Sequence, residues 1–166
     1  MPNDAINTKK APRRKLQFAD LSAILADLDR LEAAEASGRL VRNGNWTLGQ
    51  NTHHVADLIG QSIDGFRFSA PWPLRVIFRI LRPLMLGKPI PAGIGLKGQS
   101  LTLIPDEEIS ASQGLGELRD QIKRITGGER MTQPSPIFGK LSHEQWVSMH
   151  CRHAELHLSF LDPGQS

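Results

Sequence analysis

The sequence predicts an all-α fold, a four-helix bundle with a long irregular connection between its second and third helices. Two observations predict it. Apolar residues recur at helical spacings of three and four in four separate segments, and no segment alternates apolar and polar residues as a half-buried strand does. The 166 residues suffice for one domain with a sizeable core. We expect that domain over residues 16–164, after a basic flexible tail over residues 1–15.

The first two helices are indicated by their apolar stripes and by their capping residues. Asp20 can cap the start of the first helix and Gly38 can end it. Thr47 and Gln50 have the spacing of a capping box, so a second helix should begin there and stop before Pro71. The two stripes are Phe18, Leu21, Leu25, Leu28 and Leu31, and then Val55, Leu58, Ile59, Ile63 and Phe66.

The connection over residues 71–105 is rich in proline and glycine, but it contains the strongly apolar stretch "LRVIFRILRPLMLG". Arg75, Arg79 and Arg82 share one helical side of this stretch, a pattern that can lie on a membrane surface. The alternative is a short helix that packs over the bundle with its arginines in water. We favour the second interpretation, because the stretch is short and ends in Gly-Lys-Pro.

The third and fourth helices have clear boundaries. Gly127 and Gly128 should end the third helix, and Ser142 with Gln145 has the spacing of a capping box for the fourth. The fourth helix should end near Asp162-Pro163-Gly164. The stripes are Leu115, Leu118, Ile122 and Ile125, and then Trp146, Met149, His150, His153, Leu156, His157 and Phe160.

Composition and charge narrow the function classes. No apolar run approaches the roughly 18 residues of a transmembrane helix, and the N-terminal segment lacks the apolar core of a signal peptide, so we expect a cytoplasmic protein. A single cysteine, Cys151, excludes a disulfide framework and a cysteine-based zinc cage. The basic run Lys9–Lys15 could touch nucleic acid or an anionic membrane, but we interpret it as a solvated arm and expect no specific nucleic-acid partner. A small-molecule substrate is the expected partner, and a homodimer stays open.

Two histidines of the fourth helix are candidate metal ligands, and the alternative is a pair of core histidines whose nitrogens bond other groups of the protein. His153 and His157 are four residues apart, so their Cβ atoms lie about 5 to 6 Å apart on one face. That face also carries apolar residues and should point inward, where an unpartnered imidazole costs about 1 to 3 kcal/mol. A metal ion would remove that cost. On the second helix, His54 faces the same way as Gln50, whereas His53 is turned about 100° away and should be exposed.

Trp46-Thr47, followed by His54, and the C-terminal "HAELHLSF" resemble the DinB-like superfamily of metal-binding four-helix bundles. The string "SPIFGKLSHEQWVSMHCRHAELHLSF" and the opening "RRKLQFADLSAILADLDRL" are similar to a DinB-related subgroup of uncharacterised bacterial proteins. The resemblance runs from about Arg13 to Asp162 and is weakest between Pro71 and Gln113.

The resemblance implies that His54, His153 and His157 hold the metal. The sequence departs from related ones at Ser159, where they often carry glutamine, and His150 is an additional histidine on the same stripe. His150 could replace a ligand or support one, as could the polar Gln50 on the inward face. Asp57, one turn after His54, is a weaker candidate for orienting a ligand or acting as a base. Cys151 and Glu155 point away from the pair, and we expect a packed or surface thiol and a solvated charge near Arg152.

Three neutral imidazoles leave one or more coordination positions open on Zn²⁺, Ni²⁺ or Fe²⁺, as catalytic sites require. Such an ion can activate water or bind a thiol as thiolate. The resemblance implies either route, because some relatives are transferases or isomerases that use low-molecular-weight thiols and others look like metal-dependent hydrolases. Our first hypothesis is a thiol-dependent S-transferase acting on a small electrophile. The alternatives are a metal-dependent hydrolase and a non-catalytic, metal-stabilised bundle that binds a ligand or partner through residues 71–105.

Overall fold

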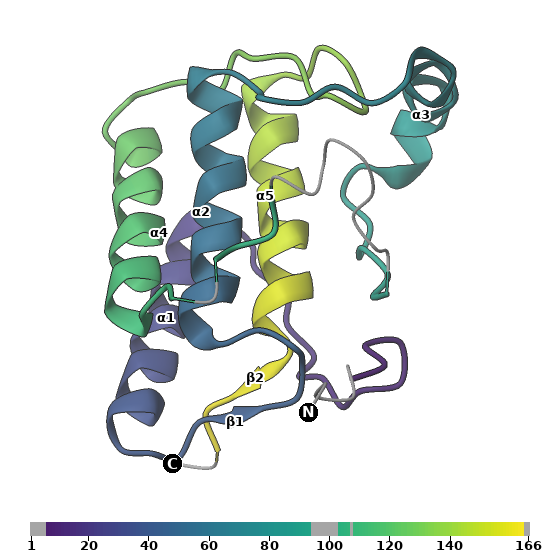
Figure 1. Ribbon diagram of the computed structural model, residues 1–166. Coiled ribbons are helices and arrows are strands. Elements are labelled where there is room, and N and C mark those ends of the chain that lie inside the picture. The colour runs from purple at the N-terminus through teal and green to yellow at the C-terminus, as the bar shows by residue number, and fades with distance from the viewer. Residues whose placement is uncertain (1–5, 94–102, 107, 165–166) are drawn as a thin grey trace.

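The computed structural model describes residues 6–93, 103–106 and 108–164, and over these residues the chain is mostly helical (Figure 1). In chain order the elements are α1 (Leu21–Ala36), β1 (Val41–Arg42), α2 (Leu48–Asp64), α3 (Trp72–Met85), α4 (Ala111–Thr126), α5 (His143–Leu158) and β2 (Leu161–Asp162). α2 lies between α4 and α5, and α1 packs against both of these helices from behind. The predicted helical class is therefore confirmed. α3 projects away from the other helices.

The predicted caps form as side-chain hydrogen bonds. Asp20 accepts from the backbone N–H of Ala23 at 2.9 Å at the start of α1. Both hydrogen bonds of the capping box are present at Thr47, which begins α2, and at Ser142, which begins α5. Gly38 follows α1 with a φ of 69°, a left-handed conformation that favours glycine. Local sequence chemistry therefore sets where these helices begin and end.

The core forms where the predicted apolar stripes of α1, α2, α4 and α5 meet. Its fully buried members include Leu28, Leu31, Val55, Ile59, Leu118, Ile122, Trp146 and Leu158. α2 and α4 make the most extensive helix contact, and two glycines allow it. A Cβ atom on Gly114 would overlap the carbonyl oxygen of Gly49 and the hydroxyl of Thr52, so the two backbones approach more closely than larger residues would permit.

A short antiparallel strand pair was not predicted. Val41 pairs with Asp162 and Arg42 pairs with Leu161. α5 accordingly ends at Leu158, before the predicted end near Asp162-Pro163-Gly164, because the chain leaves the helix to pair with β1. Strands of two residues are too short to show an alternating pattern, so sequence periodicity could not reveal them.

The favoured interpretation of the 71–105 connection is wrong about packing. The connection contains α3, a helix of 14 residues, but none of them is buried and the helix does not pack over the core. Instead, the Arg82 guanidinium donates to the carbonyl of Lys140 at 2.8 Å, and the ring of Phe78 meets Phe138 edge-on. Residues 94–102 of the predicted irregular connection and Glu107 lie outside the described residues. No described helix is long and apolar enough to cross a lipid bilayer.

The end of the predicted basic tail is docked on the helices. The guanidinium of Arg14 forms two hydrogen bonds of 2.8 Å with the buried carboxylate of Asp27 and a third, of 3.0 Å, with the carbonyl of Leu158. Further towards the N-terminus, the Asn45 side chain bonds both the N–H and the carbonyl of Ile6. Arg14 therefore makes the contacts of a packed domain. Residues 1–5 lie outside the described residues, and their flexibility stays a prediction.

Candidate metal centre

Three histidine side chains from two neighbouring helices meet at one point. His54 comes from α2, while His153 and His157 come from consecutive turns of α5. One nitrogen of each ring lies within 4.8 Å of the corresponding nitrogens of the other two. The ring centroids are 4.5 to 5.0 Å apart. The three residues that the sequence singled out as ligands are thus brought together.

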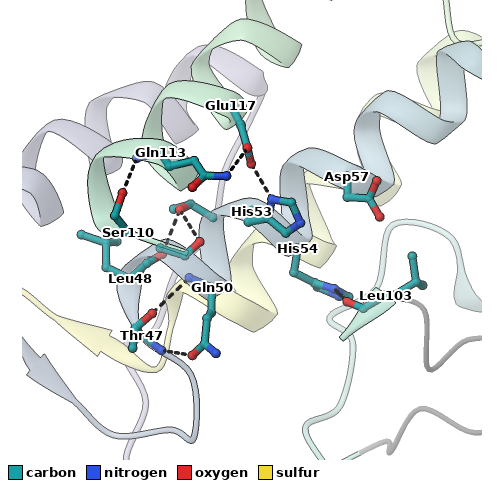
Figure 2. Close-up of polar contacts among 12 residues, drawn as sticks. Thr47, Leu48, Gln50, His53, His54, Asp57, Leu103, Ser110, Gln113 and Glu117 are labelled. Carbon is teal, nitrogen blue, oxygen red and sulfur yellow. Dashed lines mark hydrogen bonds and ion pairs between the residues drawn. The ribbon is translucent and has the colours of Figure 1, made fainter. Parts of the chain in front are cut away.

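The hydrogen bond of His54 fixes which of its ring nitrogens is free. Its Nδ1 lies 2.7 Å from the carbonyl oxygen of Leu103, and Figure 2 shows the ring directed at that residue. A carbonyl oxygen only accepts, so Nδ1 carries the proton and Nε2 of the neutral ring has a free lone pair. Metal-ligating histidines commonly have their second nitrogen held in this way. Leu103 was missed by sequence reasoning, because its contribution comes from the backbone.

Trp46 forms an aromatic wall beside the histidine cluster. Its ring stacks on His157, with centroids 5.4 Å apart and planes inclined by 9°, and it meets His54 at 4.9 Å. The tryptophan precedes the capping residue Thr47, so the same turn that begins α2 also positions this wall. Sequence analysis identified Trp46 as part of the motif that contains His54, but it did not predict that the ring contacts the histidines.

Burial keeps the three imidazoles neutral. It lowers the pKa of His54, and it lowers the pKa values of His153 and His157 well below their ordinary value, with mutual repulsion among the histidines adding to the effect. Neutral imidazole is the form that binds a metal ion. Nδ1 of His153 is also shielded from solvent and has no hydrogen-bond partner among the described residues. The electrostatics and this unpartnered nitrogen both fit a metal ligand set.

The site lies at the edge of the core rather than inside it. His54 is buried with 4% of its surface exposed, whereas His153 and His157 are half-buried, so the expected inward orientation is only partly right. Zinc–nitrogen bonds of about 2.0–2.1 Å in a tetrahedral arrangement place ligand nitrogens about 3.3 Å apart. The nitrogens therefore need to approach by at most about 1.5 Å to share one zinc ion.

The structure places Gln50 and His150 in other interactions. The Gln50 side chain completes the cap of α2 and donates to the carbonyl of Asp106 at 3.4 Å. His150 is fully buried, stacks on Trp146, and has its Nε2 3.1 Å from the hydroxyl of Ser62. His150 does not belong to the group of nitrogens that could share an ion. Gln50 and His150 each satisfy polar groups around the helices.

Asp57 is held by two partners. Its carboxylate accepts from the Gln61 side chain at 2.7 Å and forms an ion pair with Arg67. His53, one position before His54, is half-buried rather than exposed, and its Nδ1 lies 2.5 Å from a carboxylate oxygen of Glu117 on α4 (Figure 2). Both side chains thus have partners other than the three-histidine cluster.

The remaining candidates on α5 also point elsewhere. Cys151 is buried, as a packed thiol should be, and burial raises its pKa to about 11. The expectation that Glu155 is solvated is wrong, because only 8% of it is exposed. Its carboxylate pairs with Arg152 at 2.7 Å and accepts from the Phe18 N–H at 2.6 Å, which satisfies the buried charge. The hydroxyl of Ser159 donates to the carbonyl of Leu156.

These features define a mostly helical protein with a candidate three-histidine metal centre. The chain belongs to the family described as "protein of unknown function (DUF1569)", whose model matches residues 10–164. The match includes Arg14 as well as all three histidines. No curated protein and no solved structure matched the chain.

Proposed function

We propose that this protein is a metal-dependent enzyme of the DinB-like type, in which α1, α2, α4 and α5 form the four-helix bundle. The mutual packing of these helices and the resemblance of the segments around His54 and His157 support the assignment. The observation that carries the proposal is the convergence of three neutral histidine nitrogens within 4.8 Å. His54, His153 and His157 would hold one divalent transition metal, such as Zn²⁺, Ni²⁺ or Fe²⁺.

The chemistry we favour is thiol S-transfer to a small electrophile. When bound, the ion would hold a low-molecular-weight thiol as its thiolate and so supply a nucleophile at neutral pH. This route needs no protein base. Asp57, the candidate base of the sequence, is held by Gln61 and Arg67, which favours the thiol route over hydrolysis. His153 and His157 are only half-buried, so the proposed metal lies near the protein surface, as a site that takes up a small thiol requires.

Metal content measured by elemental analysis tests the ligand assignment. The purified protein should contain one transition-metal ion per chain, and His54→Ala, His153→Ala and His157→Ala should each lose it. His53→Ala is the matched control, because His53 is bonded to Glu117 outside the cluster and should leave the metal content unchanged. Full occupancy in the His153→Ala and His157→Ala proteins would overturn the assignment.

Cobalt substitution separates the thiol route from its alternatives. A bound thiolate should produce a sulfur-to-cobalt charge-transfer band, and turnover of model electrophiles with the same thiol should vanish in His54→Ala. Cys151→Ser excludes a signal from the chain's own thiol. If no thiol alters the spectrum or supports turnover, the transferase assignment is abandoned. Ester or amide cleavage would then indicate a hydrolase, and the absence of any turnover would indicate a metal-stabilised binding protein.

A further inference from the structure

α3 turns an apolar face to solvent. Trp72 is 75% exposed, Ile80 72% and Leu84 61%, and no residue of the helix is buried. The other exposed apolar residues of α3 are Leu74, Val76, Ile77, Leu81 and Met85. A contiguous apolar surface of this kind marks an interaction site in a stable protein.

The opposite side of α3 is basic and faces the rest of the chain. Arg82 donates to the carbonyl of Lys140, and Phe78 meets Phe138 with ring centroids 6.1 Å apart. Arg75 and Arg79 lie on the same helical side as Arg82, and both are exposed. The helix is thus attached by its arginine side, and its apolar residues are left exposed. α3 itself projects away from the other helices (Figure 1).

The charge of this region has one sign. No aspartate or glutamate occurs between Asp64 and Asp106, so α3 and its flanking segments carry only arginine and lysine as charged residues. Arg67 is neutralised by Asp57, but no carboxylate among the described residues pairs with Arg75 or Arg79. A partner for this surface therefore has to supply both an apolar phase and negative charge.

We propose that α3 docks this protein on an anionic phospholipid membrane. The helix of 14 residues is too short to span a bilayer, which takes about 20, so it lies in the plane of the interface with its apolar face among the acyl chains. Arg75 and Arg79 lie on the opposite, polar side of the helix and reach headgroup phosphates through their long side chains. Trp72, at the first position of α3, lies at headgroup depth, where tryptophan is favoured.

A second copy of the chain fits this surface less well. A two-fold dimer through α3 would bring the same surface of both copies together. Such a dimer would leave Arg75 and Arg79 without a counter-charge, because residues 65–105 of the second copy provide no carboxylate to pair with them. An anionic membrane supplies the missing charge and the apolar phase at once. The proposal does not rest on the metal site, and His54→Ala protein should bind membranes like the wild type.

Co-sedimentation of the full-length protein with lipid vesicles tests the proposal. The protein should bind vesicles of phosphatidylcholine mixed with phosphatidylglycerol and should bind pure phosphatidylcholine much more weakly. Ile80→Glu and Leu84→Glu should each reduce the partition coefficient by at least about tenfold, because each removes a large inserted side chain. Val41→Glu, which changes an exposed apolar residue on β1, should leave binding unchanged.

Charge and fluorescence variants locate the contact. Combining Arg75→Gln with Arg79→Gln should weaken binding by about thirtyfold, since each basic residue at an anionic surface contributes about fivefold. The matched pair Arg30→Gln with Arg42→Gln removes the same charge from α1 and β1 and should have a small effect. Emission of the exposed Trp72 should shift to the blue with vesicles, and Trp72→Phe should abolish the shift.

Three results would overturn the proposal. The first is the absence of binding to the anionic vesicles. The second is binding that Ile80→Glu does not weaken, or that leaves Trp72 emission unshifted, because α3 would then not be the contact. The third is a lipid-independent dimer in sedimentation velocity that Ile80→Glu dissociates, which would assign the apolar face to a second copy. Circular dichroism should show unchanged helix content in these variants, since the substituted residues are exposed.

Discussion

Replacing Arg14 by methionine should destabilise the protein by about 3 kcal/mol, although Arg14 lies in the segment that the sequence marked as a flexible tail. The side chain of Arg14 is 16% exposed and that of Asp27 only 5%, so the two charges are largely removed from water. Their two hydrogen bonds of 2.8 Å are the main compensation for the buried carboxylate. Methionine keeps much of the side-chain volume but leaves Asp27 buried without a counter-charge.

The expected loss of stability follows from removing only one partner of a buried ion pair. Removing one partner of such a pair typically costs about 3 to 5 kcal/mol, and the partial exposure of Arg14 favours the lower end. Arg14 also donates to the carbonyl of Leu158, and its backbone N–H donates to the carbonyl of Ser159. These bonds hold the end of α5 that carries His157, so metal affinity should fall as well.

Urea unfolding of three variants tests whether the ion pair of Arg14 and Asp27 stabilises the protein by this amount. Arg13→Met is the matched control, because the guanidinium of Arg13 only lies over the ring of Phe160, a contact worth about 0.5 to 1 kcal/mol. Arg14→Met combined with Asp27→Leu should recover most of the loss, since it removes both charges. The reasoning is refuted if Arg14→Met costs no more than Arg13→Met, or if the double variant is less stable than Arg14→Met alone.

Three further predictions concern stability and reactivity. Burial lowers the pKa of His150 to about 3 in the folded protein. As the pH falls below about 6.5, His150 therefore binds a proton in the unfolded chain but not in the folded one, and the free energy of unfolding decreases. Between pH 7 and pH 5, the free energy of unfolding measured with urea should therefore fall by about 2 kcal/mol less in His150→Gln than in the wild type. Equal decreases would show that His150 does not cause the pH dependence. Gly114→Ala should lower the free energy of unfolding by about 1 to 3 kcal/mol, because its Cβ would overlap α2. Gly116→Ala, whose Cβ would meet open space, should be neutral or stabilising by up to about 1 kcal/mol. Equal melting temperatures of the two variants would contradict the close approach of α2 and α4. Cys151 should react slowly with thiol reagents in the folded protein and fully after unfolding, because burial raises its pKa to about 11; rapid labelling of the native protein would show that the thiol is accessible.

The starts of the helices could be predicted because their causes are local. A capping side chain such as Thr47 or Ser142 bonds a backbone N–H only three residues away, so the necessary information lies within one turn. The apolar stripes similarly identify the buried faces, because helical spacing places their residues on one side. Residues such as Leu118 and Ile122 were therefore assigned to the core before any tertiary contact was known.

The packing of α3 could not be predicted by the same reasoning. Its sequence shows an amphipathic helix, but periodicity alone does not say which face meets the rest of the chain. The outcome depends on Phe138 and Lys140, which are distant in sequence and hold the arginine side. Burial of Glu155 was missed for a similar reason, since its partner Phe18 precedes α1.

The sequence by itself indicated the candidate ligands. Helical spacing places His153 and His157 on one face and His54 on the inward face of its helix, and the resemblance to the DinB-like superfamily implies that the three act as one ligand set. Only the tertiary structure decided that the three rings meet. It also decided that Leu103 sets the tautomer of His54 and that Trp46 closes one side, while Asp57 and His150 bond elsewhere. The physical reason is the range of the interactions. Helix periodicity and caps act over a few residues, whereas the ligand set, its hydrogen bonds and its exposure depend on how α2, α5 and the segment containing Leu103 pack together.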